Sequence, residues 1–456
     1  MSEIRDTIFG FIEPESDEWD ILNSTLLQRL RRIKQLALAF LVYPGALHTR
    51  FEHSLGVFYL ASVMAKKLLA KTDEKDQRQI VRLAALLHDV GHGPFSHVSE
   101  SVLELFSTQD SSEEITEKIH EKITAELLRS DKELKRIIGQ KKIDTVIGLL
   151  SGDKVDISLM KQIVSGPIDA DKQDYLLRDS YFCGVKYGVY DYSRLINTLE
   201  RYQDDGDEYI CIQKDGIHAL EQFILAKYFM TQQVYRHRIR LISDEMIIRG
   251  IELGIKKDDI TELKRLYIYE KTDAYLQNYK KWWGDRLFNL LVFDKKNGYA
   301  HHIFERLYNR KLFKKVFEIK FLEIGEIHGP ARPILKKIAK KENKTRREQL
   351  ESEIARVLKV KPEYTIINAY QVKSVKEVSR DGDREGSITI KINGNMRKFE
   401  DESTVFRSID DQLKEVWVEV YAPVSFKDKR DREKKLKEWK KEITAILKNI
   451  GTLWEI

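Results

Sequence analysis

Apolar residues recur every three or four positions through most of residues 24–320, and this period limits the fold more than any other feature. It is clear in "STLLQRLRRIKQLALAF", "EHSLGVFYLASVMAKKLL" and "ITEKIHEKITAELLRS", where it gives each segment one apolar helix face. Only "EYICIQ", residues 208–213, has the pattern of a short strand. This part of the chain is therefore predicted to form a helical bundle.

The period changes after "IHGPARP", residues 327–333, where prolines and a glycine predict a linker. The segments "YTIINAY", "GSITIKINGNMRKFE" and "EVWVEVYAP" have the pattern of strands, and Asn393-Gly394 predicts a hairpin turn. Helical patterns flank them in "RREQLESEIARVL" and "REKKLKEWKKEITAILKNI". We predict a mainly α protein, with a helical-bundle domain over residues 1–326 and a smaller α+β domain over residues 327–456.

The composition is that of a globular protein, with 33% charged and 42% hydrophobic residues. The sequence contains no apolar run of about 18 residues that could span a membrane. The N-terminal "MSEIRDTIFGF" lacks the basic and apolar regions of a secretion signal. Cys183 and Cys211 form neither a disulfide framework nor a CxxC pair. We expect a cytoplasmic protein with no membrane partner.

The charge pattern gives only weak support to a nucleic-acid partner. The formal net charge of +6 permits an anionic ligand without requiring one. Two basic runs, "KKIAKKENKTRR" (336–347) and "KDKRDREKKLKEWKK" (427–441), contain interspersed acids and apolar residues at helical intervals. This pattern favours solvated helix faces over a nucleic-acid surface.

Histidines cluster in one part of the sequence. Of the 11 histidines, those between positions 48 and 120 are His48, His53, His88, His92, His97 and His120. The stretch "ALLHDVGHGPFSH" places His88 and Asp89 at the end of an amphipathic helical pattern, where glycines follow. Imidazole and carboxylate together suit zinc, iron, manganese or cobalt. The sequence therefore predicts a metal site here.

Two further segments offer ligands for this site. "HTRFEHSLG" contains His53, with Arg50 about one helical turn before it. "GPIDADKQDYLLRD", residues 166–179, places four aspartates around a predicted helix start. We expect Asp169 to cap that helix, because a carboxylate there accepts from free N–H groups.

The order H…HD…D, in "PGALHTRFEHSLG", "HDVGHGPFSH" and "DADKQDYLLRD", resembles the HD-domain phosphohydrolases. Within them, the chain is most similar to the deoxynucleoside triphosphate (dNTP) triphosphohydrolases, a family that includes the mammalian sterile-alpha-motif and HD-domain restriction factor. The similarity spans roughly residues 5–290 and is fainter beyond, and the sterile-alpha-motif module is absent. The resemblance implies an enzyme that cleaves dNTPs to deoxynucleoside and inorganic triphosphate.

The resemblance also implies a divalent cofactor, which would be Fe, Mn, Zn, Co or Mg. Carried over by position, the metal ligands are His53, His88, Asp89 and Asp171. Two imidazoles and two carboxylates nearly neutralise a dication and leave positions for water and a phosphoryl oxygen.

Catalytic roles fall on residues beside the metal ligands. Matching histidines in the family lie along the phosphate chain, and a leaving 5′-oxygen needs a proton. His97 is the first choice for this acid. His120, with its neighbour Glu121, is expected to orient or assist, and His92 to hold a phosphate oxygen.

Phosphate binding is implied for three cations, Arg50, Lys172 and Lys227. Lys227 stands where the family carries an arginine, so it keeps the charge and loses the bidentate fork.

Sugar and base contacts are implied for Tyr175 and Asp179 at the 3′-hydroxyl, and for Gln35 with Leu36 beside the sugar and base. Tyr235 in "QQVYRHR" matches a tyrosine that crowds the 2′ position. An aromatic wall there would exclude ribose.

One departure from the family concerns regulation. Members controlled by a guanine nucleotide carry an aspartate where Asn23 stands here, although Gln28 and Arg31 remain. Activation by an effector nucleotide is therefore left open. We expect a homodimer or homotetramer.

Two alternative functions stay open. One is another HD nucleotide phosphomonoesterase or phosphodiesterase, which the set of Tyr175, Asp179 and Tyr235 disfavours. The other is a nucleic-acid-binding protein with a vestigial HD site, suggested by the basic runs.

Overall fold

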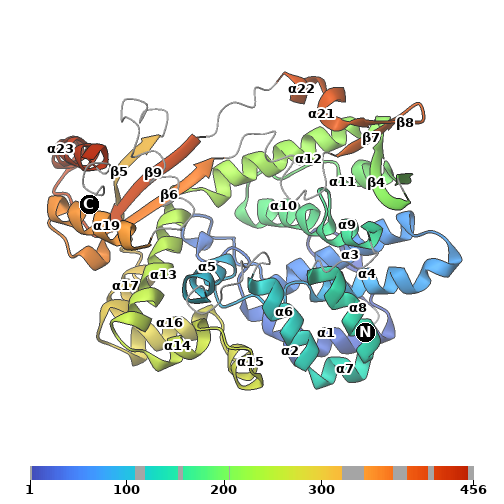
Figure 1. The fold of residues 1–456 in the computed structure, drawn as a ribbon, viewed down its shortest axis with the longest axis horizontal. Helices are drawn as coiled ribbons and strands as arrows, with labels where there is room; N and C mark the ends of the chain where they lie inside the picture. Colours follow the sequence, from blue (N-terminus) through green and yellow to red (C-terminus); the bar gives the residue numbers. More distant parts are fainter. Residues whose placement is uncertain are drawn as a thin grey trace. The chain divides into compact units, whose positions relative to one another are not determined.

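The computed structural model describes residues 3–107, 119–151, 158–204, 206–320, 344–372, 388–408 and 415–449. The described chain is mainly helical with small sheets (Figure 1), which confirms the predicted fold class. It forms two compact units. The first contains Met1–Arg240, Ile260–Leu290 and Val375–Ile409, and the second contains Leu241–Asp259, Leu291–Ser374 and Asp410–Ile456. The predicted domain boundary at residues 326–327 lies outside the described residues and stays a prediction.

Helices make up most of the first unit, as the apolar period predicted. The longer ones are α3 (Arg50–Leu68), α4 (Lys75–Leu87), α5 (His97–Ser107), α6 (Ile119–Ser130), α8 (Gln140–Ser151), α10 (Ala170–Cys183) and α12 (Ile217–Met230). The shorter ones are α1 (Ser16–Asn23), α2 (Thr25–Gln28), α7 (Lys132–Ile138), α9 (Ser158–Ser165), α11 (Tyr192–Asn197), α14 (Thr261–Tyr267), α15 (Asp273–Tyr279), α16 (Gly284–Asn289), α21 (Phe399–Glu402) and α22 (Thr404–Arg407). In the described part of the chain, no helix is both long and apolar enough to cross a membrane.

Helix α3 is the central helix of this bundle. Thr49 and Glu52 form a capping box that starts it, with the Thr49 N–H donating to Glu52 Oε2 at 2.6 Å. The helix is buried on most sides and packs against α4 and α10. A Cβ on Gly56 would lie 1.8 Å from Asp174 Oδ1 of α10. Glycine therefore permits the close approach that brings His53, one turn earlier, against α10.

Strands β3 (Leu199–Asp204) and β4 (Asp207–Gln213) form an antiparallel pair in the first unit. The sequence predicted only the second of them. Most of β3 is partly or fully exposed, so the alternation that reveals a half-buried strand is missing. The hairpin of β1 (Ile4–Asp6) and β2 (Gly10–Ile12) is also new.

The hairpin predicted at Asn393-Gly394 is confirmed. Both residues have positive φ, 50° and 83°, between β7 (Thr389–Ile392) and β8 (Asn395–Lys398). Its neighbours differ from the prediction, because β7 pairs in parallel with β4, giving a sheet in the order β3-β4-β7-β8. The hairpin thus belongs to the first unit and not with the other C-terminal strands. Local periodicity identifies a strand without identifying its partner.

The second unit contains the sheet β5-β9-β6. Its strands are β5 (Lys314–Lys320), β9 (Glu415–Ala422) and β6 (Ile366–Val372), all antiparallel to their neighbours. Strand β5 falls in the stretch predicted to be helical, and that part of the prediction was wrong. The core of the sheet, including Val316 and Val418, packs against α19 (Lys344–Leu358) and α23 (Lys429–Asn449). Most of α13 (Arg238–Lys256), together with α17 (Tyr299–Tyr308), completes the unit.

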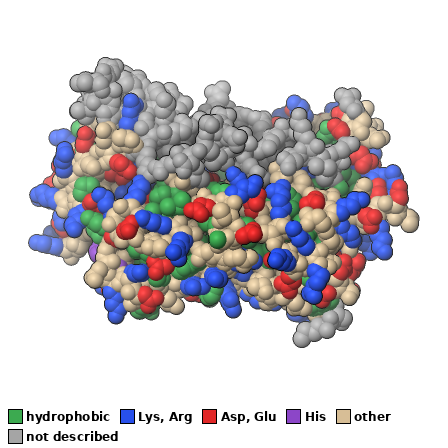
Figure 2. Space-filling model, turned by 60° about the horizontal axis from the view of Figure 1, so that its bottom comes forward, with side chains coloured by type: hydrophobic (Ala, Val, Ile, Leu, Met, Phe, Trp, Pro, Cys, Tyr) green, Lys and Arg blue, Asp and Glu red, His purple; other side chains and the backbone are tan. Residues whose placement is uncertain are grey.

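The basic run at residues 427–441 lies largely on α23, where Lys435 Nζ pairs with Asp431 Oδ2 at 3.0 Å, four residues away. Most of the other run lies outside the described residues. Basic and acidic side chains are interspersed on the face in Figure 2. Both observations favour solvated helix faces over a basic nucleic-acid surface.

Candidate functional site

A pocket of about 450 Å³ lies in the first unit, a size typical of small-ligand sites. Residues from separate segments of the sequence meet in its wall. The predicted site residues that line it are Gln35, Leu36, Arg50, His88, Asp89, His92, His97, His120, Glu121, Asp171, Lys172, Tyr175, Asp179 and Tyr235. His53 contacts this wall through Asp171, whereas Lys227 is buried in α12 and does not line the pocket.

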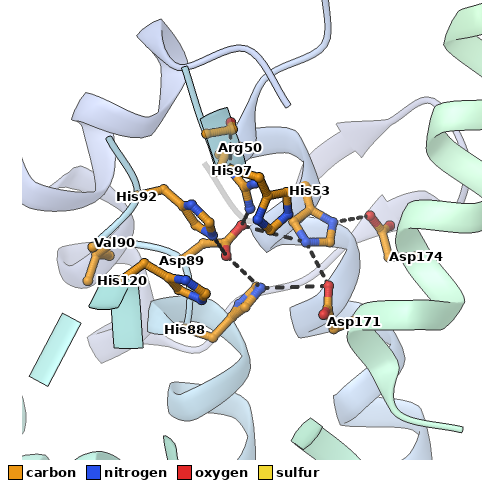
Figure 3. A network of polar contacts seen from close by, with 12 residues as sticks. Arg50, His53, His88, Asp89, Val90, His92, His97, His120, Asp171 and Asp174 are labelled. Atoms are coloured by element: carbon orange, nitrogen blue, oxygen red, sulfur yellow. Dashed lines mark hydrogen bonds and ion pairs between the residues drawn. The ribbon is translucent and has the colours of Figure 1, made fainter. Parts of the chain in front are cut away.

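Two imidazoles and two carboxylates converge at one end of the pocket (Figure 3). His53 Nε2 lies 3.0 Å from Asp171 Oδ1 and 3.6 Å from Asp89 Oδ2. His88 Nε2 lies 3.3 Å from Asp89 Oδ1 and 3.9 Å from Asp171 Oδ1. One ligand atom each from His53, His88 and Asp89 lies within 4.8 Å of the others. Three of the four predicted ligands are therefore close enough to share one ion, and Asp171 lies beside the two imidazoles.

The outer nitrogens of both imidazoles are held in place. His53 Nδ1 lies 2.7 Å from Asp174 Oδ2, and His88 Nδ1 lies 2.8 Å from the Ala85 carbonyl. Because both partners are acceptors, each Nδ1 carries the hydrogen when the ring is neutral, which leaves Nε2 as the metal-ligating nitrogen. His88 Nε2 is buried without a hydrogen-bond partner in the described structure, since its approach to Asp89 lacks hydrogen-bond geometry. This orphaned nitrogen fits a metal ligand.

A buried charge network supports Asp174. Arg178 donates to Asp174 through Nε and Nη2, both at 2.9 Å, and through Nη1 to Asp6 Oδ2 at 2.9 Å. Burial would raise the pKa of Asp174, but Arg178 and His53 outweigh it and keep that pKa below its ordinary value. Asp174 therefore stays ionised and fixes the His53 ring.

The local charge favours a cation. Burial would lower the pKa of His53, but its bonds to Asp171 and Asp174 raise that pKa to about 10. Burial would likewise raise the pKa of Asp89, yet Arg50, His88 and His92 hold it well below its ordinary value. The carboxylates that favour a proton on His53 also favour a divalent ion there, and Asp89, being ionised, can act as a ligand. The donor set fits such an ion.

Three further histidines stand beside this cluster. His92 and His120 stack with ring centroids 4.3 Å apart, and His92 Nε2 lies 3.2 Å from Asp89 Oδ1. Nε2 of His92 is thus engaged by Asp89, and the expected contact of His92 with a phosphate oxygen stays a prediction. The side chain of His97 is 63% exposed, so a ligand in the pocket can reach it.

Glu100 on α5 joins two of these histidines and was not predicted. It lies 3.1 Å from His97 Nδ1 and also bonds His120 Nδ1. Nδ1 of His120 is therefore engaged by Glu100, and the expected pairing of His120 with Glu121, which also lines the pocket, stays a prediction. The signal was present in the sequence, because residues three apart on a helix share a face and Glu100 follows His97 at that spacing.

Arg50 and Lys172 contribute cations to the wall. Arg50 donates from Nη1 to Asp89 Oδ2 at 2.5 Å and from Nε to Ser96 Oγ at 3.0 Å. Its Nη2 is buried and has no partner among the described residues, so it can donate to an anion. Lys172 Nζ pairs with Asp169, whose side chain also accepts from the Lys172 N–H at 2.7 Å. The predicted helix cap at Asp169 is thereby confirmed.

A carboxylate and a tyrosine hydroxyl are paired elsewhere in the pocket wall. Asp171, Tyr175 and Asp179 share one face of α10 at spacings of four, which spreads them over roughly 12 Å. A π-helical turn, Thr231–Tyr235, follows α12 and places the Tyr235 hydroxyl 2.7 Å from Asp179 Oδ2. Arg240, which was not predicted, also lines the wall with its guanidinium 5.3 Å from the Tyr235 ring centroid.

A helical bundle whose buried His/Asp cluster lies at the wall of a pocket of small-ligand size has the arrangement of an HD-type hydrolase. The sequence matches the HD domain over residues 50–173 and the HD associated region over residues 190–438. The chain belongs to the HD-domain phosphohydrolase family, as its motifs predicted, among relatives that include dNTP triphosphohydrolases.

Three proteins illustrate the similarity. An uncharacterized protein of Methanocaldococcus jannaschii is 37% identical over 275 residues, which cover 58% of this chain and 53% of that protein. The deoxynucleoside triphosphate triphosphohydrolase SAMHD1 of Bos taurus is 29% identical over 78% of this chain and 62% of its own. The solved structure of a phosphohydrolase from Bacteroides thetaiotaomicron has a TM-score of 0.70 at 26% identity, covering 92% of this chain and 99% of its own. The chain spans about half the length of the first of these relatives.

Proposed function

We propose that this protein hydrolyses dNTPs to deoxynucleoside and inorganic triphosphate with the help of a divalent metal ion. The observation that carries the proposal is a single pocket that joins the His/Asp cluster at one end to the Asp179–Tyr235 pair at the other. The similarity to SAMHD1, whose name states this activity, supports the same substrate class.

The metal would be held by His53, His88, Asp89 and Asp171. When bound, a divalent ion supplies Lewis-acid polarisation of a phosphoryl oxygen. Arg50 then acts on the phosphates from beside Asp89, using the Nη2 that has no partner in the described structure. Lys172 adds positive charge from the same wall.

The leaving 5′-oxygen needs a proton, because an alkoxide is a poor leaving group. His97 is accessible in the pocket, and its Nδ1 is held by Glu100, so its Nε2 can present a proton to the substrate. His120 shares the same carboxylate and can assist.

The sugar is recognised at the other end. Asp179 can accept a hydrogen bond from the 3′-hydroxyl, and the ring of Tyr235, which lines the same pocket, would then crowd a 2′-hydroxyl. An added hydroxyl there would clash or remain unpaired, which favours deoxyribose.

A product assay tests the proposal. Metal-loaded protein is incubated with each dNTP and NTP, singly and in mixtures, and the products are identified by chromatography. Deoxynucleoside and inorganic triphosphate are expected. Asp89→Asn should remove this activity, whereas Asp215→Asn, at a surface aspartate with a 77% exposed side chain, should not. Release of single inorganic phosphate groups in place of triphosphate would contradict the proposal. Hydrolysis of nucleoside monophosphates or cyclic nucleotides in place of dNTPs would also contradict it.

A further inference from the structure

His48 belongs to the histidine cluster of the sequence and has no part in the mechanism above. Its side chain is fully buried, and it lies two residues before α3. Its ring stacks on Phe182 with centroids 4.7 Å apart, and its Nε2 lies 2.7 Å from Asp179 Oδ1. His48 thus connects the segment before α3 to two residues of α10.

The chemistry of the two groups decides which of them donates in the His48–Asp179 hydrogen bond. An ionised carboxylate only accepts, so His48 Nε2 carries the hydrogen and donates it. Its Nδ1 is buried and finds no hydrogen-bond partner in the described chain. The bond to Asp179 is therefore the hydrogen bond that the His48 ring makes within the described residues.

Asp179 is therefore held through both oxygens. His48 donates to Oδ1 from the segment before α3, and Tyr235 donates to Oδ2 at 2.7 Å from the turn after α12. These two donors fix the plane of the carboxylate. Each oxygen retains acceptor capacity, and Asp179 lines the pocket.

We infer that His48 is a positioning residue that sets the selectivity of the pocket for a sugar hydroxyl. By fixing the carboxylate plane, it aims the remaining acceptor sites of Asp179 at the 3′-hydroxyl of a bound nucleotide. A site built to bond a hydroxyl rejects an analogue that lacks it, because its acceptor is then left unpaired. This inference rests on the proposed function. His48 does not line the pocket, so it acts only through Asp179.

The test pairs variants of His48 with two substrates of the same base, a dNTP and the 2′,3′-dideoxynucleoside triphosphate, which lacks the 3′-hydroxyl. His48→Leu removes the donor at similar volume, and His48→Gln keeps an amide donor near the place of Nε2. The unmodified enzyme should prefer the dNTP in kcat/KM. His48→Leu should reduce that preference about tenfold, the usual effect of losing a hydrogen bond to a charged group, with little change for the dideoxy substrate. His48→Gln should retain most of the preference.

Phe182→Leu is the matched packing control, because it removes the ring against His48 and leaves the donor. This variant should change kcat/KM for the dNTP and for the dideoxy substrate by the same factor. If His48→Leu does not fold, His48→Asn repeats the comparison, since its shorter amide takes the place of Nδ1 and does not reach Asp179. If folded His48→Leu loses kcat/KM equally for the dNTP and the dideoxy substrate, the inference is overturned.

The unmodified protein separates the two proposals. Equal turnover of the dNTP and the dideoxy substrate would overturn the role of His48 and leave the proposed function standing. No turnover of any dNTP would overturn both.

Discussion

The Nδ1 of His53 lies 2.7 Å from Oδ2 of Asp174, and both side chains are buried between α3 and α10. The bond turns Nε2 of His53 toward Asp89 and Asp171. Asp174 is held in turn by Arg178, which also pairs with Asp6. The residues expected to hold a metal are therefore linked to a charge network that begins at the N-terminal hairpin.

Asp174→Asn should weaken metal binding by about 10- to 100-fold, the usual effect of losing the partner of a ligating histidine. It should also destabilise the fold by about 3–5 kcal/mol, because a buried ion pair is broken and Arg178 keeps Asp6 as its remaining carboxylate partner. Metal content by elemental analysis and the Tm check both effects.

The control for Asp174 is Asp6→Asn. It removes the other partner of Arg178 and has no contact with His53, so it should lower the Tm and keep the metal. Equal loss of metal in both variants would show that folding, and not the His53 bond, decides the effect.

Asp89→Ala should abolish bound metal and turnover, because it removes a charged ligand of the dication. Arg50 also loses a partner at 2.5 Å in this variant, so circular dichroism should accompany elemental analysis and the dNTP assay. Full metal occupancy together with normal turnover would remove Asp89 from the site.

The sequence was sufficient to predict those elements whose own residues form a clear local pattern. The helical period predicted the bundle, and the Asn393-Gly394 turn predicted its hairpin. Strand β3 was missed because most of its side chains are partly or fully exposed, so no alternation of apolar and polar residues appears. The pairing of β7 with β4 connects residues 211 and 389, and no local pattern contains a partner so distant.

The site shows the same division. The family resemblance, carried by the order of the motifs, implied a metal site at His53, His88, Asp89 and Asp171, and the structure brings the first three together. That order could not identify Glu100 as the shared partner of His97 and His120, because the neighbour of His120 in sequence is Glu121. It also could not show that Lys227 does not line the pocket. An alignment assigns a residue to a place in the sequence, whereas the packing of the helix decides which way its side chain points.

Tyr235→Ala should reduce the ratio of kcat/KM for dNTP to that for NTP, because the variant lacks the ring proposed to crowd the 2′ position. The comparison is kcat/KM for dATP and ATP in both proteins. Tyr235→Phe is the control, since it keeps the ring and loses only the bond to Asp179. An unmodified enzyme with equal kcat/KM for dATP and ATP would contradict the proposed preference for deoxyribose.

His97→Ala should keep the metal and the nucleotide but lose about 10²–10⁴-fold in kcat, the usual contribution of general-acid catalysis. His97 is exposed in the pocket and does not belong to the four expected metal ligands, so its loss should spare metal binding. A substrate analogue with a much better leaving group needs no proton, and its turnover should be largely retained in the variant.

Glu100→Gln should give a smaller loss of kcat than His97→Ala, since His97 remains but loses its ionised partner. A variant with normal kcat and raised KM would instead assign His97 to phosphate binding. His120, which bonds the same carboxylate, would then be the better candidate for the acid.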